Sequence, residues 1–208
     1  MIVESKKYNL PVKNYTPIES KKSLIVIGNT LNCEMKHVIG WLHRLNGEYK
    51  KTAAFTISSD GIVYKHFEPK YFSKFFKNNN ELNNRSIVIL LENLGPLIKD
   101  VEKNVFLTWT DDIYNEINDV FDKKWRGYNF WTPYTDKQIT SLIELVQVLC
   151  DRFDIPLKAI GHNTKLTNIS DFNGVIYKSN LEKHYIDPNP NLNYELIKNK
   201  IENYERKY

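Results

Sequence analysis

Short apolar runs alternate along this chain with stretches in which apolar residues recur at helical spacing. Short apolar runs bounded by turn residues are typical of buried strands, whereas a period of about 3.6 residues is typical of helices. Strands are predicted on this basis at 24–27, 53–57, 62–66, 86–91 and 158–161. Asp60-Gly61, between the second and third of these, predicts that they form a hairpin. The alternation of the strands with helical stretches predicts an α/β fold, in which a central mixed β-sheet is flanked by helices.

The longest helical pattern spans residues 135–154. Thr135 is its expected N-cap, and Gln138 is expected to complete a capping box by reaching back to the cap N–H. The stripe expected to face the sheet comprises Ile139, Leu142, Ile143, Val146, Leu149, Cys150 and Phe153.

Two further helices and one loop complete the expected organisation. A helix between Glu34 and Leu45 should bury one face, and a closing helix is expected at 193–206. The face expected to be buried in the first of these comprises Met35, Val38, Ile39 and Leu42. Residues 163–190 are expected to form a long loop.

The chain has 208 residues, which is enough for one domain with its own core. Residues 1–22 are polar and are expected to form an extended arm before a domain over 23–208. A net charge of +4 is too weak and dispersed to predict nucleic acid binding. No apolar stretch is long enough to predict a membrane span. Segment 1–7 lacks a hydrophobic region, so no signal peptide is expected.

Four motifs follow one another in a particular order. Segment 25–30 reads Ile-Val-Ile-Gly-Asn-Thr, 89–93 reads Ile-Leu-Leu-Glu-Asn, 161–162 reads Gly-His, and 187–190 reads Asp-Pro-Asn-Pro. This order and spacing resemble the zinc N-acetylmuramoyl-L-alanine amidases, whose relatives include phage endolysins and peptidoglycan-recognition proteins. The resemblance implies the fold of that family, with cell-wall peptidoglycan or a muropeptide as the ligand.

The resemblance also implies a set of zinc ligands, and this sequence departs from it. The family holds zinc with a His after the first strand, a His after the last strand, and an Asp or Cys before Pro. His162 matches the second ligand and Asp187 the third, whereas Gly28 stands where the first should be. Asn29 offers only a neutral oxygen, and His184 is the best reserve ligand. We therefore expect no cofactor, with zinc bound only if an altered site is functional.

Other polar positions of the family have changed as well. Tyr185 stands where the family has a Lys two residues before the liganding Asp, and Lys183 is displaced by two further positions. Leu90 occupies a usual Glu position, with Glu92 two residues later. Glu92, Tyr185 and Lys183 remain as weak catalytic candidates, and Asn189 replaces a Gly.

Substrate contacts are expected from Asn29, Thr30, Asn93 and Trp131. Trp131 belongs to a dense aromatic group over 109–134, which is either a glycan-stacking groove or a small satellite core.

These features predict an amidase-like domain, impaired in catalysis, that acts as a peptidoglycan-binding or phage virion (tail or baseplate) module. Its partners would be peptidoglycan or muropeptides and other phage structural proteins. It would reside in the virion or the host cytoplasm and act at the cell wall. One alternative is an active amidase with an altered zinc site, and a third is a purely structural virion protein.

Overall fold

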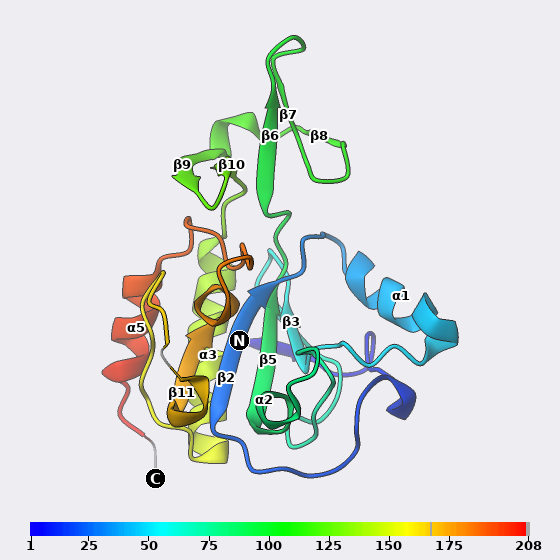
Figure 1. The fold of residues 1–208 in the computed structure, drawn as a ribbon, viewed down its shortest axis with the longest axis vertical. Helices are drawn as coiled ribbons and strands as arrows, with labels where there is room; N and C mark the ends of the chain where they lie inside the picture. The colour runs from blue at the N-terminus through cyan, green and yellow to red at the C-terminus, as the bar shows by residue number, and fades with distance from the viewer. Residues whose placement is uncertain (167, 207–208) are drawn as a thin grey trace.

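The computed structural model describes residues 1–166 and 168–206, and its strands form two sheets (Figure 1). The larger sheet has six strands in the order β1-β4-β3-β5-β2-β11. They are β1 (Ile2–Glu4), β2 (Leu24–Asn29), β3 (Phe55–Ile57), β4 (Ile62–Lys65), β5 (Ser86–Leu91) and β11 (Gly174–Tyr177). All neighbours pair in parallel except β3 and β4, which form the expected hairpin. The mixed sheet expected from the sequence is confirmed.

Helices flank this sheet. They are α1 (Lys36–His43), α2 (Asn80–Arg85), α3 (Asp136–Phe153), α4 (Lys178–Leu181) and α5 (Tyr194–Glu202). In the view of Figure 1, α3 lies behind the sheet, with α1 and α5 on opposite sides of the molecule. In the described residues, no helix combines the length and apolar character that crossing a membrane demands.

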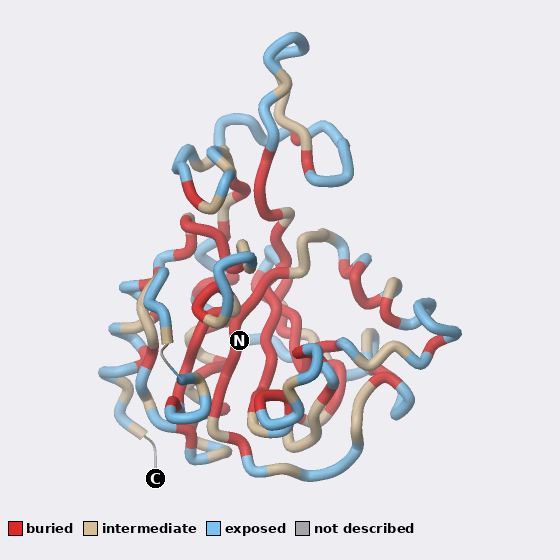
Figure 2. The backbone as a smooth tube through the Cα atoms, viewed as in Figure 1, coloured by how far each residue is buried: buried red, intermediate tan, exposed pale blue. Residues whose placement is uncertain are grey.

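The two central strands are apolar at nearly every position because both of their faces are covered. Ile25, Val26 and Ile27 in β2 are completely buried, and Ile89 and Leu91 in β5 are buried to the same extent. Strands buried on both faces show continuous apolar runs rather than alternation. Figure 2 shows these buried strands at the centre of the sheet.

The outer edge of the sheet differs from the expectation. β11 lies inside segment 163–190, which was expected to be a loop, and pairs with β2 from Gly174 opposite Leu24 onward. Residues 158–161, expected as the last strand, meet β11 only through a bridge between Ala159 and Val175. They border the sheet without forming a ladder strand, because β11 takes the place beside β2.

The expected N-terminal arm makes contacts with the rest of the fold. β1 pairs with β4, from Ile2 opposite Ile62. Further along, Leu10 and Asn14 are buried. The Asn14 amide donates hydrogen bonds to the backbone oxygens of Gly47 and Tyr49 at 3.1 and 2.9 Å.

The second sheet projects from one end of the molecule (Figure 1). It is antiparallel, with the order β8-β7-β6-β10-β9. Its strands are β6 (Pro96–Asp100), β7 (Val105–Leu107), β8 (Ile113–Tyr114), β9 (Phe121–Trp125) and β10 (Tyr128–Trp131). Leu97 and Trp131 are buried at its base, whereas Val101 at its tip is 81% exposed. Most of the aromatic group thus belongs to this small sheet.

The long helix agrees with the prediction in its cap and stripe but not in its capping box. The Thr135 hydroxyl accepts a hydrogen bond from the Gln138 N–H at 3.1 Å, as expected. The Gln138 side chain turns away from the cap and donates to the backbone oxygens of Ile57 and Glu92, both at 2.9 Å. Its amide satisfies carbonyl groups at the ends of β3 and β5, so the capping box prediction is wrong.

The short helix α1 also turns a different face inward. His37, Val38 and Trp41 are buried, while Ile39 and Leu42 are 50% and 38% exposed. The predicted face is therefore wrong for these last two residues. The reason is a polar contact across the core, because His37 Nε2 lies 3.0 Å from Thr56 Oγ1 of β3.

Candidate functional site

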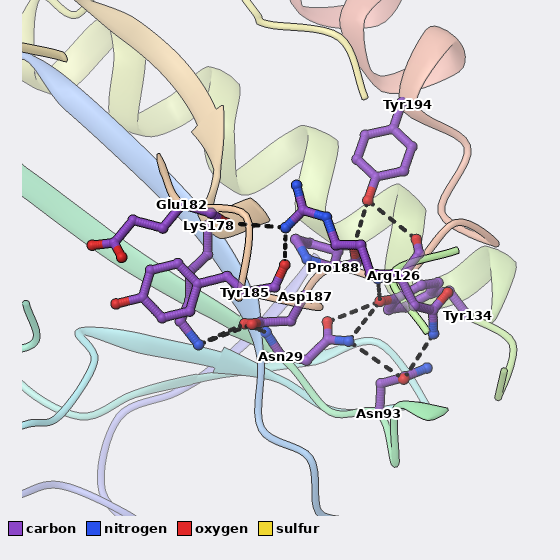
Figure 3. A network of polar contacts seen from close by, with 11 residues as sticks. Asn29, Asn93, Arg126, Tyr134, Lys178, Glu182, Tyr185, Asp187, Pro188 and Tyr194 are labelled. Atoms are coloured by element: carbon purple, nitrogen blue, oxygen red, sulfur yellow. Dashed lines mark hydrogen bonds and ion pairs between the residues drawn. The ribbon is translucent and has the colours of Figure 1, made fainter. Parts of the chain in front are cut away.

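The carboxyl ends of β2 and β11 bring together residues that are far apart in the sequence. β2 ends at Gly28-Asn29, Lys178 directly follows β11, and Asp187 lies in the loop after α4. Neighbouring parallel strands end at the same edge of a sheet, and that edge is where α/β folds place their ligands. Figure 3 shows these side chains converging.

Asp187 lies at the centre of this group and is only 2% exposed. Lys178 Nζ contacts its two carboxylate oxygens at 2.9 and 3.0 Å. The backbone N–H of Asn29 donates to Oδ2 at 3.0 Å. Both oxygens therefore already have charged or polar partners from the protein itself.

Gly28 leaves no room for a side chain. A Cβ atom there would lie 2.8 Å from Asp187 Oδ2, 3.3 Å from Leu90 Cδ2 and 3.4 Å from Lys178 Cδ. The first of these distances is shorter than real Cβ contacts, so any other residue would displace the carboxylate. The Lys178–Asp187 ion pair therefore requires glycine at position 28.

Tyr185 and Arg126 hold the segment that carries the ion pair. The Lys178 ammonium lies 4.6 Å from the centre of the Tyr185 ring, a cation–π contact. The Arg126 guanidinium donates to the backbone oxygens of Ser179 at 2.8 Å and Glu182 at 3.0 Å, and also to that of Tyr185. One arginine from the second sheet thereby fastens the chain between α4 and Asp187 (Figure 3).

His162 is half-buried between two aromatic rings. Its ring stacks on Tyr194 at 4.4 Å and lies 4.9 Å from the Trp125 ring. Burial, aided by the charges of Lys123 and Arg126, lowers its pKa to about 4. Its Nε2 atom is buried without a hydrogen-bond partner among the described residues. Whether His162 and Asp187 share one metal remains a prediction.

The reserve ligand and the displaced lysine lie at the surface. His184 Nδ1 is 3.0 Å from Glu182 Oε2, and its side chain is 65% exposed. Lys183 is exposed as well. Neither residue touches Asp187 in the network that surrounds the carboxylate.

Asn29 and Asn93 belong to a buried amide network. Asn29 Nδ2 donates to Tyr134 Oη at 2.7 Å, and Asn93 Oδ1 accepts from Asn189 Nδ2 at 3.1 Å. Asn93 Nδ2 donates to the backbone oxygen of Pro133 at 2.9 Å. Both ends of the Asn93 side-chain amide are therefore hydrogen-bonded within the protein. Its amide is not free to make the substrate contact expected from the sequence.

Three other expected site residues are buried or hydrogen-bonded within the chain. Trp131 is completely buried, so no ring face is available to stack on a sugar. Glu92 accepts from the N–H groups of Met35 at 2.8 Å and Ser59 at 3.4 Å, and burial raises its pKa. The Thr30 hydroxyl donates to the Asn32 backbone oxygen at 2.7 Å.

A basic cleft lies between α1 and the end of β2. Its volume is about 190 Å³, and its lining includes Lys36, Arg44, Lys51, Trp41, Tyr49 and Thr30. Among the described residues, no carboxylate lines it. Lys51 also lines a larger cavity of about 790 Å³ that contains Tyr185 and Asn180. Positive charge therefore gathers beside the buried Asp187.

Comparisons with known proteins identify the family. The family model for N-acetylmuramoyl-L-alanine amidase matches residues 19–174, which is most of the chain. The chain belongs to the N-acetylmuramoyl-L-alanine amidase family. Among curated proteins, no sequence matches it.

Solved amidase structures share the fold at low sequence identity. The endolysin amidase LysCS from Clostridium intestinale is 17% identical, with a TM-score of 0.56 over 96% of this chain and 94% of that one. A mutant endolysin from Bacillus subtilis is 15% identical, with a TM-score of 0.56 over 97% and 99%. The amidase AmiD from E. coli, solved with a muropeptide substrate, is 14% identical, with a TM-score of 0.54 over 89% and 59%.

The donor set of this amidase-family chain does not fit a three-ligand zinc site. Gly28 has no side chain, and both Asp187 oxygens face Lys178. In residues 1–166 and 168–206, no three side chains of His, Cys, Asp or Glu gather closely enough to hold a metal ion. A hydrolytic zinc site needs three protein ligands and an open position for water.

Lys178 is the site residue that sequence reasoning missed. It follows Tyr177 at the carboxyl end of β11, in a segment expected to be a loop. A polar residue directly after a buried parallel strand was the available signal, but it depends on recognising Val175-Ile176-Tyr177 as a strand.

Proposed function

We propose that this amidase-family domain binds muropeptides without cleaving them, as a cell-wall-binding or phage virion (tail or baseplate) module. The observation that carries the proposal is the basic cleft beside Asp187, where Lys36, Arg44 and Lys51 lie with no carboxylate in the described lining. A muropeptide with γ-linked glutamate, like the one bound to E. coli AmiD, carries a free carboxylate that would complement these cations.

The aromatic residues of the same cleft support a ligand with an apolar or sugar portion. Trp41 and Tyr49 line it, and the Arg44 guanidinium lies 5.4 Å from the Tyr49 ring centre. Such a mixture of aromatic walls and a few charged groups is typical of small-molecule sites.

The absence of cleavage rests on the chemistry of three positions. Gly28 supplies no ligand, Leu90 cannot accept or relay a proton, and Tyr185 replaces the lysine expected to face the oxyanion. Removing one donor to a developing oxyanion typically costs about 100-fold to 1000-fold in rate. These defects act on the same transition state and do not offset one another.

An active amidase with an altered zinc site is the second candidate, and one observation favours it. His162 Nε2 is buried without a hydrogen-bond partner among the described residues, and a lowered pKa keeps the imidazole neutral. A neutral imidazole nitrogen is a good zinc ligand. The third candidate, a purely structural virion protein, predicts neither binding nor cleavage.

The test combines binding and cleavage on the same protein. We expect purified muropeptide to bind in calorimetry, and we expect intact peptidoglycan to release no L-alanine-terminated peptides with added zinc. Release that a chelator abolishes would establish the active amidase instead. Neither binding nor release would favour the structural protein.

A matched pair of variants locates the binding site. Lys51→Ala should weaken muropeptide binding about tenfold, because one charge-assisted contact contributes about 1.4 kcal/mol or more. Lys200→Ala removes an equal charge from α5, on the opposite side of the molecule from α1 (Figure 1), and should leave the affinity unchanged. Equal losses of affinity in both variants would show that only net charge matters, and would contradict the assignment of this cleft as the binding site.

A further inference from the structure

The Lys178–Asp187 ion pair is built into the end of the sheet rather than placed on the surface. The Lys178 side chain is 17% exposed and the Asp187 side chain 2%. A carboxylate removed from water in this way needs a cation or several hydrogen bonds beside it. Here the ammonium contacts both oxygens, and the Asn29 N–H supplies one more bond.

The groups around the pair fix its geometry from several elements. Asn29 comes from β2, Lys178 from the start of α4, and Tyr185 from the loop before Asp187. Arg126, from the turn between β9 and β10, donates to the backbone oxygens of Ser179, Glu182 and Tyr185 (Figure 3). These contacts hold the Lys178 ammonium in place beside the Asp187 carboxylate.

The space that a first metal ligand would use is filled by the same pair. A Cβ at Gly28 would meet Asp187 Oδ2 at 2.8 Å and Lys178 Cδ at 3.4 Å. A ligand side chain at this position and the observed ion pair exclude one another. The absence of a side chain at Gly28 therefore makes room for the ion pair between Lys178 and Asp187.

We propose that Lys178 is the resident cation of this site, taking the place beside Asp187 that the family gives to zinc. The site is then assembled without metal. Zinc would have to displace an ammonium held by both carboxylate oxygens before it could bind Asp187. This inference concerns how the site is built, and it holds whether or not a muropeptide binds in the cleft.

The first test measures zinc in the wild-type protein. After purification in zinc-containing buffer and dialysis, we expect substoichiometric metal by elemental analysis, and no change in melting temperature on adding zinc or a chelator. Tightly held zinc at one ion per chain would overturn the proposal, whatever the protein does with muropeptides.

The second test separates Lys178 from other lysines. Lys178→Met should lower the melting temperature by about 10 °C, because it leaves a buried carboxylate without its cation. Lys183→Met, an exposed lysine on the same segment, should change it by about 1 °C or less. Adding Asp187→Asn to Lys178→Met should restore at least half of the loss. Equal effects of the two single lysine variants would overturn the proposal.

The third test asks whether Lys178 competes with metal, which a merely structural lysine would not do. Gly28→His alone should bind zinc or Co2+ poorly, because the Cβ displaces the Asp187 carboxylate and Lys178 still competes with the metal for it. Gly28→His with Lys178→Ala should bind at least about tenfold more tightly. Equal metal affinities of the two variants would show that Lys178 does not compete with the metal for the Asp187 carboxylate, and would contradict the inference.

Discussion

Asn189 shows how one residue outside the family pattern can tie distant parts of the chain together. It stands where the family has glycine and is completely buried. Its side-chain Nδ2 donates to the Thr132 backbone oxygen at 2.9 Å, and its side-chain Oδ1 accepts from the Asn191 N–H at 2.9 Å. The loop that carries Asp187 is thereby joined to the base of the second sheet.

Two buried histidines share one threonine hydroxyl, and their tautomers follow from the network. His66 Nδ1 lies 2.8 Å from the Tyr8 backbone oxygen, which can only accept, so this nitrogen carries the proton. His66 Nε2, at 2.9 Å, then accepts from Thr56 Oγ1. Since the hydroxyl has a single proton, His37 Nε2 must donate to it. Both rings are neutral in this arrangement.

This pair predicts a loss of stability at acid pH. Burial lowers the pKa of His66 to about 4 and that of His37 to about 3, while unfolded histidine titrates near 6.5. The unfolded state therefore takes up protons first, so stability falls as the pH drops from about 6.5 toward 4. Each histidine contributes up to about 1.4 kcal/mol per pH unit.

Urea unfolding between pH 7 and 4 measures this dependence. His66→Gln can donate to the Tyr8 oxygen and accept from Thr56, but it cannot titrate. We expect this variant to unfold with a shallower dependence on pH than the wild type. An unchanged slope would mean that His66 does not remain neutral in the folded protein.

At the scale of elements, α3 is fixed to the sheet by a polar contact as well as by its apolar stripe. Gln138 is 1% exposed and reaches the last carbonyl of β3 and the first one beyond β5. Leu142, Val146 and Leu149 then cover the apolar face. The amide sets where the helix begins relative to the strands, while the stripe supplies most of the burial.

Gln138→Glu distinguishes this role from a capping box. Glutamate is as good as glutamine in a capping box, so that role would leave stability unchanged. A carboxylate cannot donate to two carbonyl groups, so we expect a loss of about 2 kcal/mol or more in the free energy of unfolding. Chemical denaturation measures it, and Gln147→Glu on the same helix is the control, with an expected change below about 1 kcal/mol. Equally small losses of stability in Gln138→Glu and Gln147→Glu would support the capping-box role instead.

At the scale of the whole molecule, the two sheets differ in how much of their surface is covered. The larger sheet is covered by helices, and its central strands are almost wholly buried, whereas the outer strands of the second sheet are largely exposed (Figure 2). Trp109 is 54% exposed, although its indole N–H donates to the Leu31 backbone oxygen at 2.6 Å. The second sheet is therefore attached mainly at its base.

Hydrogen exchange should reveal this difference. Amides of β2 and β5 should exchange only by global unfolding, whereas those of β7 and β8 should open locally and exchange at least about 100-fold faster. Mass spectrometry of peptic peptides under native conditions reports both rates. Equal protection of the two sheets would show that they unfold as one unit.

Several features of this protein could be read from the sequence because they depend on local patterns. The continuous apolar runs at 24–27 and 86–91 predicted the central strands, and Asp60-Gly61 predicted the hairpin between β3 and β4. Thr135 predicted the start of α3, since a cap depends on a hydroxyl and an N–H three residues away.

How these elements combine at the site depends on contacts between segments that are far apart in the sequence. β11 is four residues long and gains its place by pairing with β2, about 150 residues earlier in the chain. Asp187 was predicted as a ligand, but its partner Lys178 depends on that pairing. Because a buried carboxylate needs a cation, and only the folded chain determines which cation reaches it, the sequence alone named the family while the fold determined the ion pair.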